Sequence, residues 1–206
     1  MIDIIIFARS PVRGAVKQRL AATVGERAAL AVHRKLLRHT LRTAVRARGL
    51  RPDLRPVLWH LGPRPDRDLP AGFPGRTEAQ PFADMASNLA ASVARPALEG
   101  RRGVIVVGSD HPGLTADHLL AMAGILDRVP VAVGPAEDGG FWAVGTLVPL
   151  DHVMCKVPLG AADTRLHLTN VLERLGLAYG LGPTLWDVDT AADLERWGKE
   201  LRLPRE

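Results

Sequence analysis

The feature that most constrains the fold is a short apolar run bounded by glycines. Residues 103–108 read GVIVVG, and the four residues between the glycines are all β-branched. Such a run, without polar alternation, predicts a strand buried on both faces, as in a parallel sheet covered by helices. Its carboxyl end continues as Ser109, Asp110 and His111. In open α/β sheets the ligand crevice lies at this end of the strands, so the acid Asp110 is a candidate site residue.

The rest of the chain mostly alternates strand-like and helix-like segments. Apolar runs predict strands at 3–8, 54–61, 130–134, 141–147 and 185–188. Apolar residues at helical spacing predict helices at 25–48, 84–94, 115–128 and 163–175, and one after Thr190 that uses Leu194, Trp197 and Leu201. Residues 62–81 lack a period and predict a long irregular loop. We therefore expect one three-layer α/β/α domain over residues 1–206, with a mostly parallel mixed sheet.

Composition excludes several classes of protein. The formal net charge is +5, but aromatic residues make up 4% and no nucleic-acid-binding motif is visible, so a polynucleotide partner is not expected. The single cysteine, Cys155, excludes an intramolecular disulfide. The apolar start at 2–7 is too short for a signal peptide or a membrane span, which predicts a cytoplasmic protein. Arginines recur mostly every four residues in the 25–48 helix and predict a solvated face: Arg27, Arg34, Arg38, Arg42 and Arg46.

The first strand runs into a loop rich in cations. Residues 8–20 read ARSPVRGAVKQRL, in which Pro11 and Gly14 form a tight loop before a helix starts. Backbone N–H groups and the positive end of a helix favour phosphate there. The spacing matches neither a Walker loop nor a dinucleotide fingerprint, and a solvated basic helix start is the alternative. The cations of this segment are Arg9, Arg13, Lys17 and Arg19.

Two acids follow predicted strands. Asp110 ends the central strand, and Asp189 follows the strand predicted at 185–188. Carboxylates at these positions are typical oxygen ligands of Mg²⁺, so Asp110 is the first candidate ligand and Asp189 the second. An equally weighted alternative for Asp110 is a turn before a helix capped by Thr115.

A glycine pair adjoins two more acids. Residues 135–147 read PAEDGGFWAVGTL, and Gly139 and Gly140 follow Asp138 directly. Bare backbone at glycine allows a substrate to approach closely, which makes this segment a candidate acceptor site. A plain β-turn explains the three residues equally well.

Four segments carry a family resemblance: FARSPVRGAVKQRL, VVGSDHPGLT, GPAEDGGFWAVG and WDVDTAADL. In this order they resemble the GT-A-type nucleotide-diphospho-sugar transferase superfamily, in particular a bacterial family of GT-A-like transferases. They are also similar to 2-phospho-L-lactate and molybdenum-cofactor guanylyltransferases. The resemblance implies three groups of site residues: phosphate binding by Arg9, Gly14, Lys17 and Arg19; metal binding by Asp110 and Asp189; and acceptor binding by Asp138, Gly139 and Gly140.

The predicted function is that of a nucleotidyltransferase that uses Mg²⁺ or Mn²⁺. A phosphate or carboxylate oxyanion of a small acceptor would attack a nucleoside triphosphate and release pyrophosphate, with Lys17 and Asp110 as catalytic residues. Glycosyl transfer from a nucleotide sugar and a non-catalytic nucleotide-binding module are the alternatives. The segment at 161–164 departs from the family pattern, so the acceptor is left open. The sequence does not indicate an oligomeric state.

Overall fold

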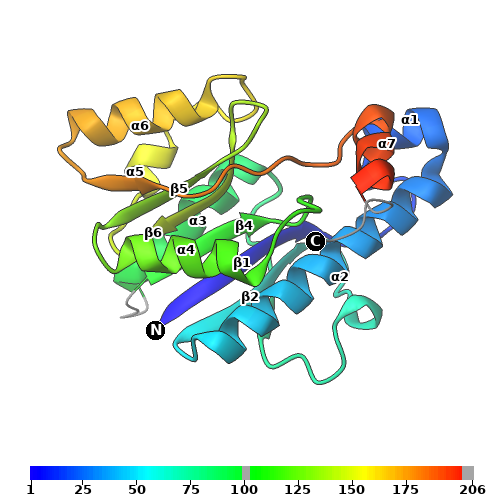
Figure 1. Ribbon diagram of the computed structural model, residues 1–206, viewed down its shortest axis with the longest axis horizontal. Helices are drawn as coiled ribbons and strands as arrows, with labels where there is room; N and C mark the ends of the chain where they lie inside the picture. The colour runs from blue at the N-terminus through cyan, green and yellow to red at the C-terminus, as the bar shows by residue number, and fades with distance from the viewer. Residues whose placement is uncertain (99–102, 201–206) are drawn as a thin grey trace.

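The computed structural model describes residues 1–98 and 103–200, and the strands of this part form one seven-stranded sheet (Figure 1). The strand order is β3-β2-β1-β4-β6-β5-β7. The sheet is mostly parallel, as predicted. Of the strands described, β6 alone runs antiparallel to its neighbours. The strands are β1 (Ile2–Arg9), β2 (Leu54–Leu61), β3 (Arg76–Ala79), β4 (Gly103–Gly108), β5 (Val131–Pro135), β6 (Phe141–Thr146) and β7 (Tyr179–Leu181).

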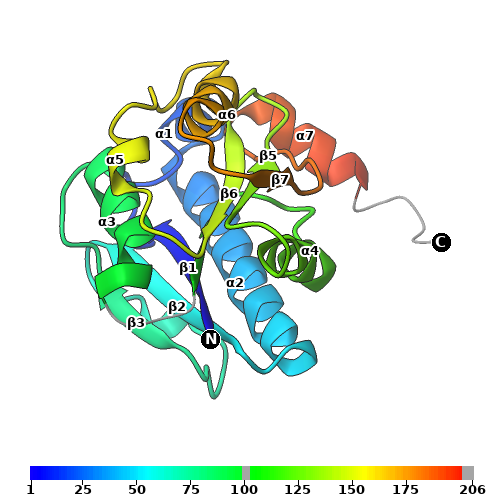
Figure 2. The same cartoon turned by 90° about the vertical axis from the view of Figure 1, so that its left-hand side faces the viewer.

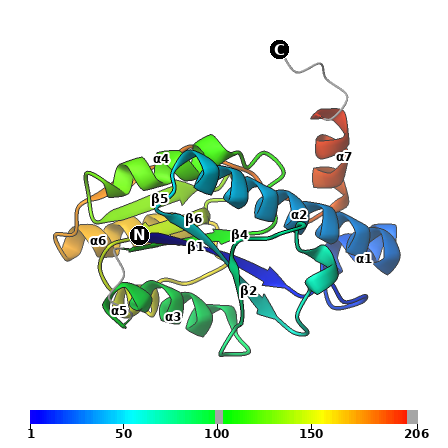
Figure 3. The ribbon, with the colours of Figure 1, turned by 90° about the horizontal axis from the view of Figure 1, so that it is seen from below.

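Helices cover both faces of the sheet. Figure 3 shows α2 and α4 on one face and α3 and α5 on the other, so the predicted three-layer α/β/α architecture is confirmed. Figure 2 shows the same layers from the side. The helices are α1 (Gln18–Val24), α2 (Glu26–Leu50), α3 (Met85–Leu98), α4 (Ala116–Leu126), α5 (Asp151–Met154), α6 (Thr164–Arg174) and α7 (Ala191–Glu200), with a short 3₁₀ helix, η1, at Asp66–Asp68.

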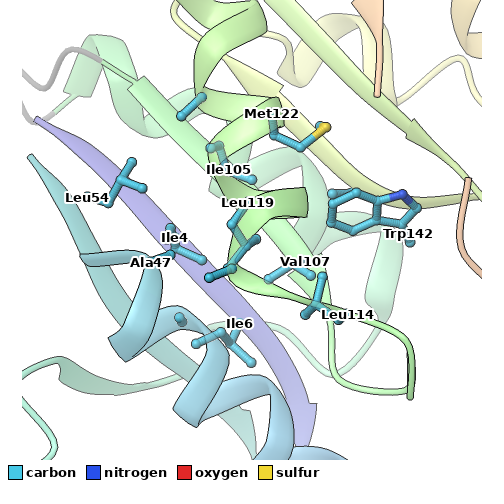
Figure 4. Packing of buried hydrophobic residues seen from close by; sticks show 14 of the residues in the cluster. Ile4, Ile6, Ala47, Leu54, Ile105, Val107, Leu114, Leu119, Met122 and Trp142 are labelled. Atoms are coloured by element: carbon cyan, nitrogen blue, oxygen red, sulfur yellow. The ribbon is translucent and has the colours of Figure 1, made fainter. Parts of the chain in front are cut away.

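Each face of the sheet has its own hydrophobic core. In the first core, Ile4 and Ile105 of the sheet pack with Leu119 and Met122 of α4 (Figure 4). In the second, Val106 of β4 packs with residues of α3, α5 and α6. The strand β4 therefore contributes alternate side chains to two cores, which explains why its sequence is apolar without interruption. The central strand predicted from 104–107 is confirmed, with every residue from 103 to 107 buried.

Two expectations for the edges of the sheet are wrong. Residues 62–81 are not wholly irregular, because they contain η1 and the edge strand β3. No strand forms at 185–188 either: Leu185 makes a single isolated bridge to Ala136, and the edge strand is β7 instead. Both edge strands are three or four residues long and have one neighbour each, so their sequences lack the apolar run of a central strand.

The last helix returns to the first helices at the carboxyl end of β1. Helices α1 and α7 contact each other, and Figure 1 shows them side by side. Trp197 of α7 packs with Trp186 and with Leu36 of α2, while Leu194 is partly buried against them. Leu201, which was expected on the same face, lies outside the described residues. Through this packing, α7 lies near the edge of the sheet where the predicted site residues lie.

Among the helices described here, none is both long and apolar enough to span a lipid bilayer.

Candidate functional site at the carboxyl edge of the sheet

A cavity of about 590 Å³ opens at the carboxyl ends of β1 and β4. This is the edge of the sheet at which ligands of open α/β folds bind. Of the residues predicted from the sequence, five line the cavity: Arg9, Lys17, Arg19, Asp110 and Asp189. Side chains that are far apart in the chain therefore meet around one space of ligand size.

Lys17 connects the first loop to both predicted acids. Its Nζ lies 2.8 Å from Oδ1 of Asp110 and 2.9 Å from Oδ1 of Asp189. Only 4% of the Lys17 side chain is exposed, so the ammonium is held inside the protein. Burial alone would lower the pKa of Lys17, but the carboxylates of Asp110 and Asp189 outweigh burial and raise it above its ordinary value. The lysine is therefore charged between two acids at the mouth of the cavity.

The backbone of Lys17 is strained. The residue has φ 50° and ψ 47°, and it is the one non-glycine residue with positive φ in the part of the chain that the structure describes. This left-handed conformation costs about 1–2 kcal/mol for a residue with a Cβ. It turns the side chain inward from the residue that precedes α1. Strain of this kind is concentrated at functional sites and persists where the surroundings hold it, as the two ion pairs do here.

Backbone hydrogen bonds hold the segment of Asp189 against the end of β4. Val188 donates its N–H to the carbonyl of Asp110 at 3.0 Å. His111 Nδ1 lies 3.2 Å from the carbonyl oxygen of Trp186. These contacts explain why Asp189 reaches the site although no strand forms at 185–188.

Arg19 and Arg9 complete the basic side of the cavity. Arg19 pairs with Asp189 and is 75% exposed, so its guanidinium can move toward a ligand. Arg9 ends β1, and its carbonyl oxygen lies 2.9 Å from Nε2 of His33 on α2. Burial lowers the pKa of His33. His33 was not among the predicted site residues, because only the packing of α2 brings it to the cavity wall.

Gly14 lies in the same loop but does not line the cavity. Its φ of 77° is accessible to glycine, and a Cβ there would lie 3.2 Å from Oε1 of Glu26. Arg13 pairs with the same carboxylate at 3.0 Å. In this structure Gly14 shapes the loop, and its role toward phosphate stays a prediction.

The segment of Asp138, Gly139 and Gly140 forms a turn next to the cavity. Oδ1 of Asp138 accepts a hydrogen bond from the N–H of Gly140 at 2.9 Å. Gly139 has φ 87°, and a Cβ there would lie 1.7 Å from the carbonyl oxygen of Ala162. The space beside Gly139 is therefore occupied by the backbone of Ala162 and not by a substrate. None of the three residues lines the cavity, although Phe141, which follows them, does.

A further acid lies close to this site. Asp187 is half-buried, and its pKa is raised to about 6 by burial and by the negative charges of Asp189 and Asp138. Asp187 and Asp189 alternate in the sequence, which by itself gives Asp187 no role. The positive charge of Lys17 acts in the opposite direction and lowers the pKa of Asp187. Asp187 therefore belongs to the same group of charged side chains as Lys17.

The opposite wall of the cavity is apolar. Leu89 of α3 is buried, whereas Met85 at the start of the same helix is 64% exposed. The four-residue spacing of Met85 and Leu89 predicts that both face the core, and for Met85 this prediction is wrong. Met85 lines the cavity instead. Other apolar lining residues are Phe7, Leu61, Val106 and Phe141.

The fold was compared with solved structures. A protein of Desulfovibrio desulfuricans G20, provisionally described as a nucleotide-diphospho-sugar transferase, superimposes with a TM-score of 0.85 at 22% identity, covering 98% of this chain and 87% of its own. CMP:2-keto-3-deoxy-manno-octonic acid synthetase, solved with CTP, gives 0.59 at 14% identity and coverages of 97% and 98%. Glucosyl-3-phosphoglycerate synthase of Mycobacterium tuberculosis, solved with Mn²⁺, UDP and its product, gives 0.57 at 10% identity and coverages of 98% and 77%.

Comparisons of sequence identify the family. No curated protein sequence matches the chain. The family DUF2064, described as an uncharacterised protein conserved in bacteria, matches residues 40–161. This match covers more than half of the chain, and the structural neighbours share its architecture from end to end. The chain therefore belongs to the DUF2064 family and has the GT-A-like fold of nucleotide-diphospho-sugar transferases and related nucleotidyltransferases.

Proposed function

We propose that this chain is a metal-dependent nucleotidyltransferase, which moves a nucleoside monophosphate from a nucleoside triphosphate to a small acceptor and releases pyrophosphate. The observation that carries the proposal is the position of Lys17, whose Nζ lies within 2.9 Å of both Asp110 and Asp189 at the mouth of the 590 Å³ cavity. Basic and acidic side chains at one strand edge are what a metal-bound polyphosphate needs.

The donor set fits Mg²⁺ or Mn²⁺. Oδ1 of Asp110 is enclosed and lies 2.8 Å from the ammonium of Lys17, which balances its charge. In the described part of the chain no three His, Cys, Asp or Glu side chains form a ready-made metal site. Mg²⁺ is commonly held by one or two carboxylates together with substrate phosphates. Asp110 and Asp189 match that mode, in which the nucleotide completes the site.

The basic and acidic side chains would have different roles in the transfer. Lys17, Arg9 and Arg19 would hold the phosphate oxygens, and Asp110 and Asp189 would hold the metal. When bound, the metal supplies neutralisation of the charge that develops on the phosphates. Phosphoryl and nucleotidyl transfers depend on positioning and electrostatic stabilisation more than on covalent help from the protein. Exposed Arg19 can follow the phosphates, whereas buried Lys17 is already in place.

Glycosyl transfer from a nucleotide-diphospho-sugar is the second candidate. One observation favours it: the fold matches the D. desulfuricans protein, described as such a transferase, over 98% of the chain. The same carboxylates and cations could hold a nucleoside diphosphate. The difference between the two chemistries lies in the product that leaves, which is pyrophosphate in the first case and a nucleoside diphosphate in the second.

A ligand panel followed by product analysis tests both candidates. Thermal shifts are measured with each nucleoside triphosphate and with nucleotide sugars, with and without Mg²⁺. A ligand at about a hundred times its dissociation constant stabilises by roughly 2.7 kcal/mol, which corresponds to about 5–11 °C for a chain of this size. Pyrophosphate formed with pooled small acceptors supports nucleotidyl transfer, and nucleoside diphosphate supports glycosyl transfer. If no nucleotide stabilises the protein, the proposal is wrong.

A further inference from the structure

Asp193 lies on the first turn of α7 and holds the backbone that precedes this helix. Its Oδ2 accepts hydrogen bonds from the N–H of Asp189 at 3.1 Å and from the N–H and the hydroxyl group of Thr190, each at 2.7 Å. The N–H of Asp193 in turn donates to Oγ1 of Thr190 at 3.4 Å. The reciprocal bonds between Thr190 and Asp193 form a capping box, which satisfies free N–H groups at the start of a helix. The bond from Asp189 is additional to this box.

A second capping box in the same chain shows what such a box needs. At the start of α4, Thr115 donates its N–H to Nδ1 of His118 at 3.0 Å, and His118 donates its N–H to Oγ1 of Thr115 at 3.4 Å. The residue before this box, Leu114, donates its N–H to the carbonyl of His111 instead. Capping a helix in this way therefore does not require a bond from the preceding residue.

Helix α7 is anchored independently of the cavity. Trp197 packs with Leu36 of α2 and with Trp186. Arg196 donates to both carboxylate oxygens of Glu137 at 2.6 and 3.0 Å, and its guanidinium lies 4.1 Å from the centre of the Trp186 ring. None of these residues lines the cavity, so their contacts can stay in place when a ligand binds.

The side chain of Asp189 is held by groups that have another proposed role. Its carboxylate pairs with Lys17 and Arg19, and both cations are proposed to bind phosphate. These ion pairs are given up when the cations turn to a nucleotide. The bond from the N–H of Asp189 to Asp193 does not depend on the cations. It can therefore keep Asp189 in place when a nucleotide is bound.

We propose that Asp193 is a positioning residue for metal binding, which acts by holding the N–H of Asp189 so that the carboxylate of Asp189 stays beside Asp110. The inference rests on the proposed function, because it concerns the metal that Asp189 would bind. Groups behind a metal ligand orient that ligand, and their loss typically lowers metal affinity or activity about 10- to 100-fold. Asp193 does not line the cavity, so it acts through Asp189 and not as a ligand itself.

Mn²⁺ binding to the full chain, measured from the EPR signal of free Mn²⁺, tests this role. It is measured in wild type and in Lys17→Met, in which no ammonium competes for the carboxylates. We expect Asp193→Ala to raise the dissociation constant about 10- to 100-fold in either background. Asp193→Asn should keep most of the affinity, because its amide oxygen can still accept both N–H bonds. Unchanged affinity in Asp193→Ala, or an equal loss in Asp193→Asn, would overturn the proposal.

The capping box of α4 supplies the matched control. Asp193→Ala and Thr115→Ala each remove one side of a capping box, so each should lower the melting temperature by about 1–8 °C. Thr115→Ala should keep its Mn²⁺ affinity, because the box of α4 does not hold Asp189. Equal losses of affinity in the two variants would mean that Asp193 has a purely structural role.

Hydrogen exchange of backbone amides tests the same bond in protein without metal. In Asp193→Ala the amide of Asp189 should exchange about 2- to 10-fold faster, because it loses its acceptor. The amide of Val188, which donates to the carbonyl of Asp110, should exchange as in wild type. Unchanged exchange at Asp189 would mean that Asp193 does not hold this residue, which also overturns the proposal.

Failure of this proposal and failure of the proposed function give different results. If wild type or Lys17→Met binds Mn²⁺ and adding Asp193→Ala changes nothing, only the role of Asp193 is rejected. If neither protein binds Mn²⁺ and no nucleotide stabilises wild type in the presence of Mg²⁺, the proposed function is rejected, and the role of Asp193 fails with it.

Discussion

At the amino end of β1, Asp3 is fully buried, and its two carboxylate oxygens accept hydrogen bonds from Arg55 at 2.8 and 2.9 Å and from Arg76 at 3.1 Å. At the carboxyl edge of the same sheet, Asp110 and Asp189 share the single ammonium of Lys17, at 2.8 and 2.9 Å. In the first cluster two arginines surround one carboxylate, and both carboxylate oxygens accept hydrogen bonds. This arrangement is typical of a structural ion pair. The second leaves an acid to be completed by a ligand.

The origin of the partners differs as well. Arg55 lies beside Asp3 in the register of β1 and β2, so regular strand pairing brings them together. Lys17, Asp110 and Asp189 come from three loops, and Lys17 adopts a strained backbone to reach the acids. The cluster around Asp3 is therefore built on regular strands and is stable. The cluster around Lys17 is built on loops, so its ion pairs can be exchanged for contacts with a ligand.

The largest expected effect is on stability, in Asp3→Asn. Removing this charge leaves two guanidinium groups beside a neutral buried side chain, which costs about 3–5 kcal/mol when one partner of a buried pair is lost. For a chain of this size the melting temperature should fall by about 6–20 °C, measured by thermal unfolding. Nucleotide affinity of the folded variant should match wild type. Lost affinity with unchanged stability would break the distinction between the two clusters.

Asp110→Asn should show the opposite behaviour. The amide cannot supply the charge that holds the metal, so turnover should fall about a hundredfold or more, while the melting temperature should fall less than in Asp3→Asn because Asp189 still pairs with Lys17. Steady-state rates and thermal unfolding measure the two quantities. Asp117→Asn, on the exposed start of α4, is the matched control and should keep its activity. A wild-type rate in Asp110→Asn would exclude the charged residues at the carboxyl edge of the sheet as the active site.

Lys17→Met tests whether the ammonium and a divalent cation compete for the same carboxylates. Without the lysine, Asp110 and Asp189 repel each other, so Mg²⁺ should stabilise the variant by roughly 2.7 kcal/mol at a hundred times its dissociation constant. Wild type should gain less, because Lys17 must first leave its partners. Melting temperatures are compared with NaCl of equal ionic strength, and exposed Lys199→Met is the control. Equal gains in the variant and in wild type would argue against a shared site.

Asp187→Asn should give the smallest effect, with a sign opposite to that of Asp3→Asn. Burial and nearby negative charges raise the pKa of Asp187 from 3.8 to about 6. Between these values the folded state binds more protons than the unfolded chain, so the free energy of unfolding falls as pH rises. At pH 7–8 the variant should melt about 1–3 °C higher than wild type, and the difference should vanish toward pH 4. A lower melting temperature at pH 7–8 would mean that Asp187 is paired with a cation.

Sequence patterns predicted the parts of the site that depend on local chemistry. The apolar run of β4 is buried as expected, and Arg9, Lys17, Arg19 and Asp110 line the cavity at its carboxyl end. The turn at Asp138 was one of two interpretations left open, and the structure contains it. The edge strands β3 and β7 were missed, because a short strand with one neighbour has little apolar periodicity.

The alternation of strands and helices, the charge of the first loop and the acid after β4 were determined by the sequence itself, because each depends on residues close together in the chain. Only the tertiary structure decided that Lys17 lies between Asp110 and Asp189, that Ala162 packs on Gly139, and that the ring of His111 contacts the carbonyl of Trp186. These features join residues up to 172 positions apart. No local pattern encodes such contacts, since they form only when the loops at the sheet edge pack against one another.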